Sequence, residues 1–402
     1  MGITINGSSA AGNIDLGTNG TITDLAVGGL PDGVVDAGTL TAAMAKPSFR
    51  NLIINGEFNV AQRSTAAVTT SSGSNEGYQT VDRWQMDMDG TTAAFTQQQV
   101  DLTAATDPDG FYKAFKIDCT TADTSVAAGD WASLVQNVEG LDWAQLNYGR
   151  SDAKTITVSF WVKSTKTGTY SFSIRNSAAN RYYIAEYTVS SSDTWEKKTI
   201  TIAGDTSGTW LTTNGIGARL GWSLIIGSTD SATAGSWNAG NKFGSSNQVN
   251  FFDNTNNNFL ITGVKLEIGS TATDFEHKSY AEELFRCQRY YYKLKNDSGS
   301  TSSHWYGGGF VDTTTQLRGG IVLPQHMRSA PTSFETTGTA GDYAVWHSGN
   351  STTTCSAVPS WASTSSSSGR LTFTVASGLT AGQGGSYRAL TTNSYLAWSA
   401  EL

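Results

Sequence analysis

Apolar and polar residues alternate along much of the segment from residue 48 to residue 278. The stretch TITVSFWVKST places every second side chain on one apolar face, and GTYSFSIRN repeats the pattern. Such alternation is typical of β-strands with one buried and one solvated face. Because no long helical pattern separates these strands, we expect an all-β fold with a jelly-roll β-sandwich over 48–278. The side chains that should face its core are Ile156, Val158, Phe160, Val162, Tyr170, Phe172 and Ile174.

The stretch NLIINGEF at 51–58 joins an apolar run, a turn dipeptide and an aromatic residue. This order predicts the first strand and corner of the sandwich. Among the tryptophans, Trp84, Trp161 and Trp195 fall within or beside the strand patterns, so we assign them to the core of this domain.

The pattern changes near residue 279. In SYAEELFRCQRYYYK, Tyr280, Leu284, Cys287 and Tyr291 recur at helical spacing, which predicts a short helical connector over 279–293 that ends in a strand. Beyond it, GGIVLP, YAVWHS, RLTFTVAS and SYLAWSAEL are strand candidates in a segment rich in Ser, Thr and Gly. We therefore expect a smaller C-terminal β-domain over 294–402.

The first 47 residues have too few apolar side chains to close a core around one chain. The segment DAGTLTAAMAK at 36–46 predicts a short helix with Leu40 and Met44 on one face and Pro47 as its stop. A helix this short is unstable alone. Three copies packed through Leu40 and Met44 would bury that face, so we predict a trimerising stalk with short β and helical pieces over 1–47, and a disordered leader is the alternative.

Composition and charge narrow the range of possible partners and functions. Only 15% of the 402 residues are charged, the net charge is -8, and no Lys/Arg cluster occurs, so we do not expect nucleic acid as a partner. The N-terminus has neither the basic nor the apolar region of a signal peptide, and no apolar run reaches the length of a membrane helix. The cysteines Cys119, Cys287 and Cys355 lack the spacing of a disulfide framework or zinc site, and we expect them to be small buried residues.

The sequence offers little support for a catalytic site. Glu139 with Asp142, and Asp193 with Glu196, are carboxylate pairs of the type that glycosidases use, but closeness in sequence does not set the separation of the carboxyl groups. The four histidines form no HExxH, and neither a GxSxG nor a phosphate-binding loop occurs. WYGGG and GQGG predict turns or close chain approaches. We therefore predict no catalytic residues and no enzyme activity.

Binding of a sugar requires less chemistry than its cleavage. Sugars present apolar C–H faces and many hydroxyl groups, so their sites combine aromatic rings with small polar side chains. The C-terminal segment has such combinations, although each aromatic residue could instead belong to the core. The candidate glycan-binding residues are Trp305, Tyr306, Trp346, His347 and Trp361.

Several stretches follow one another along the chain: NLIINGEFNVAQRS, VDRWQMD, ITVSFWVKS, TWEKKTITI, VKLEIGSTATDFEHKSYAEELFRCQRYYYK and a terminal AWSAEL. In this order they resemble the sequences of bacteriophage tail fibre proteins. The segment 51–275 also resembles jelly-roll carbohydrate-binding modules, through its N-x-I-x-N-G-x-F opening and its T-V-S-F-W-V-K strand. The leader DLAVGGLPDGVVDAGTLTAAMAKP is similar to the N-terminal linkers of such fibres.

The resemblance implies a homotrimer, made in the host cytoplasm and built into the virion tail. Its N-terminus would attach to a tail, portal or adaptor protein, and its distal end, which we expect at 294–402, would bind a host surface glycan such as lipopolysaccharide. Three functions stay open: a receptor-binding tail fibre, a structural virion or head fibre without a receptor, and a polysaccharide depolymerase on the same scaffold. The glycan site could also belong to the sandwich at 51–275.

The chain departs from the carbohydrate-binding modules where these hold a structural calcium ion. Asn59 follows Phe58 in place of a carboxylate, and Thr262 and Gly263 stand in the late strand where acids would be. Glu57 alone does not supply the several oxygen ligands that calcium takes. The acidic stretches DMDG at 87–90 and DPDG at 107–110 lack the later ligands of a calcium loop and predict tight turns. We therefore expect no metal site and no cofactor.

Overall fold

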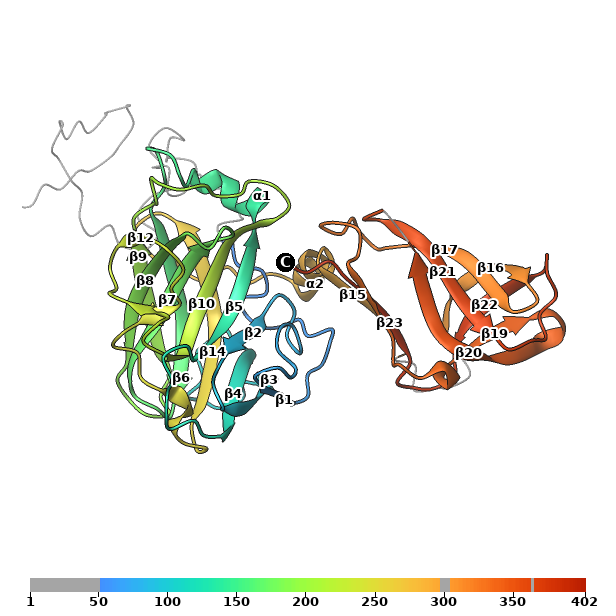
Figure 1. The fold of residues 1–402 in the computed structure, drawn as a ribbon, viewed down its shortest axis with the longest axis horizontal. Coiled ribbons are helices and arrows are strands. Elements are labelled where there is room, and N and C mark those ends of the chain that lie inside the picture. The colour runs from blue at the N-terminus through green and yellow to red at the C-terminus, as the bar shows by residue number, and fades with distance from the viewer. Residues whose placement is uncertain (1–50, 297–303, 363–364) are drawn as a thin grey trace, which may run out of the picture. The chain divides into compact units, whose positions relative to one another are not determined.

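Two six-stranded antiparallel sheets pack face to face in the first part of the chain (Figure 1). In this computed structural model, residues 51–296, 304–362 and 365–402 are described, and 49–402 group as one unit. The predicted stalk, with Leu40 and Met44, lies outside the described residues. The first sheet has the order β1 (Val68–Ser71), β3 (Ala94–Asp101), β4 (Lys113–Thr121), β14 (Asn258–Ile268), β6 (Ile156–Ser164) and β9 (Glu196–Ile202). The second has the order β12 (Trp237–Ala239), β8 (Arg181–Val189), β7 (Gly168–Asn176), β10 (Ile216–Ile226), β5 (Trp131–Glu139) and β2 (Gln85–Asp89).

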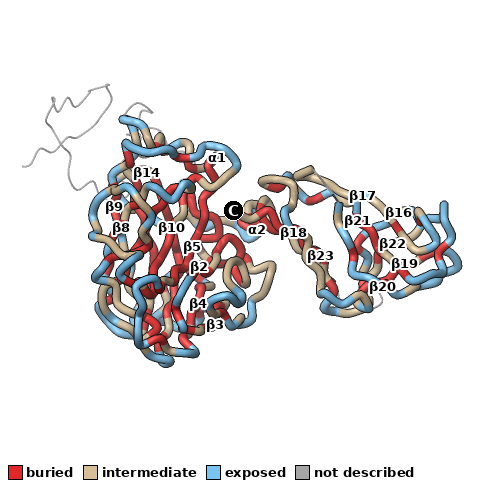
Figure 2. Tube along the Cα trace, viewed as in Figure 1, coloured by how far each residue is buried: buried red, intermediate tan, exposed pale blue. Residues whose placement is uncertain are grey.

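The core of this sandwich lies between the two sheets, and Figure 2 shows buried segments along its strands and exposed segments in the loops. All seven side chains expected to face the core, from Ile156 to Ile174, are fully buried there. The predicted all-β sandwich is therefore confirmed. Short elements complete this part: α1 (Gly140–Trp143), the 3-10 helices Ala144–Leu146 and Phe251–Asp253, and the small ladder of β11 (Ser231–Ala232) with β13 (Gly244–Ser245).

Two expectations about the sandwich are wrong. Trp84 is buried in the core, but Trp161 and Trp195 pack half-buried against a separate cluster with Phe111. Trp161 follows the core residue Phe160 on β6, and adjacent side chains of a strand point to opposite faces.

The opening stretch 51–58 is an irregular turn and forms no strand. Its backbone makes only isolated bonds to β14, from the Leu52 amide to the Leu266 carbonyl and from the Val264 amide to the Gly56 carbonyl, each at 2.9 Å. Side chains add to them: Asn51 Oδ1 accepts hydrogen bonds from the amides of Ile53 and Leu266, each at 3.0 Å. Asn55 and Phe58 adopt φ values of 60° and 58°, which a strand does not contain. The hydrophobic residues here are nevertheless buried, so the pattern correctly indicated burial but not strand structure.

The predicted short helix is present as α2 (Tyr280–Gln288), and the side chain of Ser279 caps it by accepting from the amide of Glu282 at 3.2 Å. The strand β15 (Tyr291–Lys295) follows and pairs with β23 (Tyr395–Ser399), which also pairs with β18 (Ser333–Glu335). None of the helices in the described ranges is long and apolar enough to cross a membrane.

The remaining C-terminal strands close into a six-stranded barrel with its own core. Two 3-10 helices, Ala340–Asp342 and Ser348–Asn350, precede and follow the strand Tyr343–His347. The strand order is β16 (Trp305–Thr313), β17 (Gln316–Val322), β21 (Ser368–Val375), β20 (Ser351–Ala362), β19 (Tyr343–His347) and β22 (Gly384–Ala389), which returns to β16.

One glycine cluster lies within a strand of this barrel, whereas the cluster at 382–385 begins in a turn at Gly382, with φ 86°, and enters β22 at Gly384. Gly307–Gly309 belong to β16, where Gly309 is opposite Gly385 of β22. A Cβ atom on Gly309 would lie 2.3 Å from the carbonyl oxygen of Arg318. The expected close chain approach is thus confirmed, whereas the turn interpretation of WYGGG is wrong. The three cysteines are buried and free, as expected.

Candidate functional site

Two tryptophans and an arginine meet on the outer face of the barrel, and we call Trp305, Trp346 and Arg388 the tryptophan patch. Trp305 is 44% exposed, and its ring lies edge to face with that of Trp346, with centroids 5.5 Å apart at 86°. The guanidinium carbon of Arg388 is 5.5 Å from the centre of the Trp305 ring. The sheet register explains the meeting, because β22 runs between β16 and β19 and places Arg388 opposite Trp305.

Hydrogen bonds hold two members of the tryptophan patch in place. The indole nitrogen of Trp346 donates to Asn350 Oδ1 at 3.1 Å, and Arg388 Nη1 donates to Thr352 Oγ1 at 2.7 Å. Trp305 has an exposed ring beside the exposed backbone of Gly307 and Gly308. The arrangement therefore combines a partly exposed indole with polar groups held at its border.

Tyr306 and His347 are sequence neighbours of the two tryptophans but lie inside the barrel. Tyr306 is 5% exposed and packs in the barrel core, and burial raises the pKa of its phenol. His347 is 8% exposed, and its Nε2 lies 2.9 Å from Thr353 Oγ1. The structure thus separates these two residues from the tryptophan patch, because successive residues of a strand alternate between faces.

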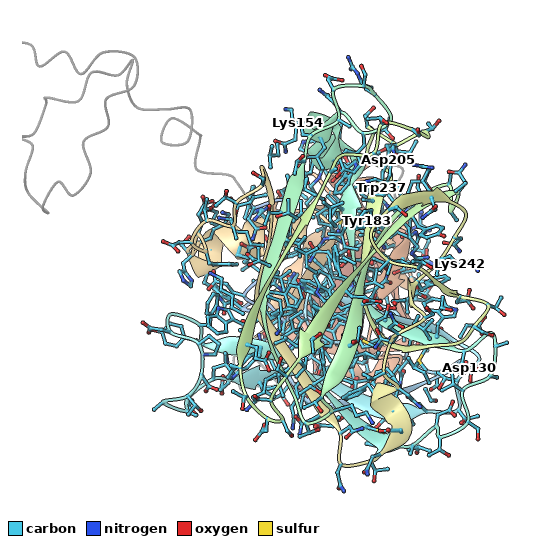
Figure 3. The ribbon with its side chains drawn as sticks, turned by 90° about the vertical axis from the view of Figure 1, so that its left-hand side faces the viewer. Asp130, Lys154, Tyr183, Asp205, Trp237 and Lys242 are labelled. Carbon is cyan, nitrogen blue, oxygen red and sulfur yellow. The ribbon has the colours of Figure 1, made fainter. Side chains whose placement is uncertain are left out.

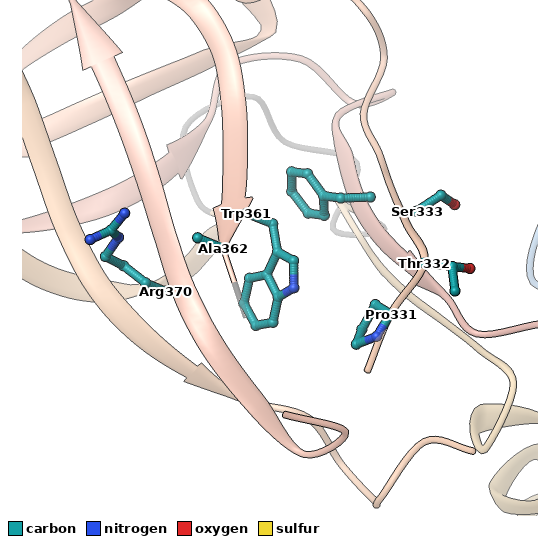
Figure 4. A pocket seen from close by; sticks show the side chains of 7 residues that line it. Pro331, Thr332, Ser333, Trp361, Ala362 and Arg370 are labelled. Atoms are coloured by element: carbon teal, nitrogen blue, oxygen red, sulfur yellow. The ribbon is translucent and has the colours of Figure 1, made fainter. Parts of the chain in front are cut away.

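Trp361 lines a different feature, a pocket of about 680 Å³ that we call the Trp361 pocket (Figure 4). The indole lies at the end of β20 between Arg370 on one side and Pro331 on the other. It packs edge to face on Trp398, with centroids 5.4 Å apart. Trp361 therefore supports the barrel core and lines the pocket at once. The pocket is lined by Pro331, Thr332, Ser333, Phe334, Trp361, Ala362 and Arg370.

An aromatic cluster also closes one edge of the sandwich. Tyr183 of β8 and Trp237 of β12 have ring centroids 5.2 Å apart, and Figure 3 shows them following Asp205 along this edge. The indole nitrogen of Trp237 donates to the carbonyl of Ala203 at 2.7 Å, and Asp205 is paired with Arg181 at 2.6 Å. Both rings are half-buried, so the cluster seals the core at the edge rather than presenting a free ring face.

The glycosidase-like carboxylates are engaged in the fold. Glu139 accepts hydrogen bonds from Arg289 Nε at 2.8 Å, from Arg289 Nη2 at 2.6 Å and from the Tyr290 hydroxyl at 2.6 Å. Burial and the neighbouring charge of Glu139 raise the pKa of Asp142. Glu196 accepts from two backbone amides at 2.8 Å and pairs with Lys198.

The residues considered for calcium have other partners. Glu57 Oε2 lies 3.0 Å from His277 Nδ1 and accepts from Asn59 Nδ2 at 3.1 Å. The tight turn predicted at 107–110 is present, where the Phe111 amide donates to the carbonyl of Pro108 at 3.3 Å and Gly110 has φ 82°. The turn predicted at 87–90 is wrong, because 87–89 belong to β2 and only Gly90, with φ 73°, lies in the bend that follows. Within the described ranges, no group of three or more His, Cys, Asp or Glu side chains could hold a metal ion.

The sequence interpretation missed the polar members of these surfaces. Arg388 and Asn350 border the tryptophan patch, and Arg370 lines the Trp361 pocket. The aromatic residues stand out in a chain rich in Ser, Thr and Gly, but no local pattern indicates that β22 places Arg388 beside Trp305. Only the strand order supplies that information.

No protein-family model matches the chain, and no curated protein matches its sequence. Among solved structures, the enzymatically active domain of tailspike protein 4 from bacteriophage CBA120 is 14% identical, with a TM-score of 0.29 over 56% of this chain and 22% of that chain. A putative sugar-binding protein from Bacteroides thetaiotaomicron is 13% identical, with a TM-score of 0.31 over 55% of this chain and 100% of that chain. The carbohydrate-binding module TmCBM61, in complex with β-1,4-galactotriose, is 11% identical, with a TM-score of 0.28 over 55% and 99% of the two chains. Similarities this weak assign neither a family nor a function.

Proposed function

We propose that this protein is a bacteriophage tail fibre component that binds a host cell-surface glycan through the tryptophan patch. The observation that carries the proposal is the exposed ring of Trp305 beside Trp346 and Arg388. A pyranose ring can lay its C–H face on an exposed indole, while its hydroxyl groups bond to polar side chains at the border.

The rigidity of the patch favours binding over a merely exposed ring. Trp346 and Arg388 are each held by a hydrogen bond to a barrel side chain, so little conformational entropy remains to be lost when a ligand docks. A single stacked sugar binds weakly. Three chains in a fibre would add such contacts as avidity, which fits the trimer expected from Leu40 and Met44.

The place in the virion rests on the sequence resemblance. The fibre would sit in the tail, attach through its N-terminus to a tail, portal or adaptor protein, and act by binding lipopolysaccharide or a similar glycan without cleaving it. Light scattering should give three times the monomer mass, and a monomer would contradict the proposed assembly. Polysaccharide viscosity should stay constant in the presence of the protein, and a fall would favour the depolymerase instead.

The binding test uses the full chain on immobilised bacterial lipopolysaccharides from a panel of strains. Trp305→Ala and Trp346→Ala should each weaken binding to the recognised polysaccharide by about 1 to 3 kcal/mol, or roughly 5-fold to 150-fold, as expected for an aromatic hot spot. Phe310→Ala is the matched control, since Phe310 lies on the same strand and is 55% exposed but is outside the tryptophan patch.

Full binding by both folded tryptophan variants would refute the role of the tryptophan patch. Trp361→Ala then decides whether the Trp361 pocket is used instead, provided that unfolding experiments show an intact barrel. Such a check is needed because Trp361 is half-buried against Trp398, and truncating a fully buried tryptophan costs about 3 to 5 kcal/mol. Full adsorption by particles whose fibres end at residue 293 would assign the glycan site to the sandwich.

A further inference from the structure

A small polar pocket, which we call the tyrosine pocket, has a volume of about 330 Å³. This volume is near the lower end of the range of about 300 to 1,000 Å³ typical of small-molecule sites, so it suits one small ligand. It is separate in lining from both the tryptophan patch and the Trp361 pocket. Its lining residues are Arg63, Tyr78, Gln79, Tyr291, Lys293, Glu335 and Tyr395.

Two cations in the tyrosine pocket are held over aromatic rings. The guanidinium carbon of Arg63 lies 3.6 Å from the centre of the Tyr291 ring, and Lys293 Nζ lies 4.2 Å from the centre of the Tyr395 ring. Lys293 Nζ also donates to the carbonyl oxygen of Arg63 at 2.9 Å. An ammonium group has three donors, and the other two on Lys293 have no hydrogen-bond partner among the described residues.

The tyrosine pocket is also lined by hydrogen-bond acceptors. Glu335 Oε2 accepts from the Tyr291 hydroxyl at 3.0 Å, and its Oε1 has no hydrogen-bond partner among the described residues. Gln79 donates through Nε2 to the carbonyl oxygen of Glu76 at 2.8 Å, which leaves its amide oxygen as a further acceptor. A ligand with several hydroxyl groups can satisfy both kinds of group at once.

The charge around the tyrosine pocket favours an anion. Glu401 is the shared partner of Arg63 and Arg83, one carboxylate for two guanidinium groups. Among the residues that line the tyrosine pocket, Arg63 and Lys293 are cations and Glu335 is the carboxylate, a net charge of +1 when all three are ionised.

We propose that the tyrosine pocket binds one sugar residue that carries a carboxylate, a uronic acid in the simplest case. Lys293 and Arg63 bind the carboxylate, and Glu335 and Gln79 accept hydrogen bonds from the sugar hydroxyls. The tyrosine rings supply the walls. This site goes beyond the proposed tryptophan patch and does not depend on it.

The test is calorimetric titration of the full chain with methyl glucuronoside and with methyl glucoside, which lacks the carboxylate. The glucuronoside should bind at least 10-fold more tightly than the glucoside. Lys293→Met should weaken glucuronoside binding at least 10-fold, while Lys295→Met should leave it within 2-fold. Lys295 is on the same strand and bears the same charge but does not line the tyrosine pocket.

Three results would overturn the proposal: no glucuronoside binding by the folded wild-type chain, equal binding of the two sugars, or equal weakening by the two lysine variants. If Lys293→Met fails to fold, Glu335→Gln takes its place: it removes a negative charge beside the ligand carboxylate and keeps an acceptor oxygen, so it should strengthen glucuronoside binding at least 3-fold and leave glucoside binding within 2-fold, and an equal change for the two sugars would count against the site. The Trp305→Ala/Trp346→Ala double variant should bind the glucuronoside normally, so failure of the tryptophan patch and failure of the tyrosine pocket are distinguishable.

Discussion

Replacing Glu139 by Gln should lower the free energy of unfolding and should have no effect on polysaccharide cleavage. The Glu139 side chain is 1% exposed and receives two hydrogen bonds from Arg289 and one from Tyr290. Glutamine keeps the shape but removes the charge and turns an NH2 group toward a donor. Removing one partner of a buried ion pair costs about 3 to 5 kcal/mol. Because the Arg289 side chain is 32% exposed, water recovers part of this loss, and we expect about 2 to 3 kcal/mol.

The assay is urea unfolding followed by tryptophan fluorescence. Asp142→Asn is the matched control: burial and then the charge of Glu139 raise the pKa of Asp142, so removing its charge should leave the free energy of unfolding unchanged or slightly higher. A double-mutant cycle with Arg289→Gln should give a coupling energy above about 1 kcal/mol, as expected for residues in direct contact.

Two results would refute this reasoning. One is a free energy of unfolding for Glu139→Gln within about 0.5 kcal/mol of wild type, the usual range for surface substitutions. The other is polysaccharide cleavage by the wild-type chain that Glu139→Gln abolishes without a change in stability, because that would make Glu139 a catalytic residue rather than the partner of Arg289.

The remaining predictions concern pH and backbone packing. Burial raises the pKa of Asp82 from 3.8 to about 6, so the folded chain binds a proton that the unfolded chain has lost, and the contribution of Asp82 to stability falls as the pH rises from about 4 to about 6. Relative to Asp82→Asn, wild type should therefore lose on the order of 3 kcal/mol across this window, and parallel pH profiles would contradict the assignment. Gly309→Ala should destabilise the barrel by about 1 to 3 kcal/mol or more, because its Cβ would collide with the carbonyl of Arg318. The control is Gly320→Ala, whose added Cβ would have no atom within 4 Å, and it should change the free energy of unfolding by less than about 0.5 kcal/mol. If urea unfolding gave equal effects for the two glycine variants, the close approach of Gly309 to Arg318 would be unimportant for stability.

The strand pattern of the sandwich was available from the sequence, because alternation is a local property. On β6, Ile156 and Phe160 point into the core of the sandwich, and Trp161 points away from it because side chains alternate along a strand. A strict application of this two-residue period would therefore have placed Trp161 outside the core. The helix α2 was also predictable, since its spacing and the cap at Ser279 lie within a few residues.

The opening stretch and the candidate site depended on contacts between distant residues. The pattern of NLIINGEF predicts a strand, yet the Asn51 side chain accepts from the amide of Leu266, more than 200 positions away, and such bonds together with two isolated backbone bonds to β14 take the place of a regular ladder. The tryptophan patch likewise exists only because β22 lies between β16 and β19 and brings Trp305 beside Arg388 and Trp346. Composition and periodicity therefore determined which residues are apolar and which faces are buried. The order of strands in the closed barrel, which local patterns do not encode, decided which aromatic rings meet at the surface and which, such as Tyr306, fill the core.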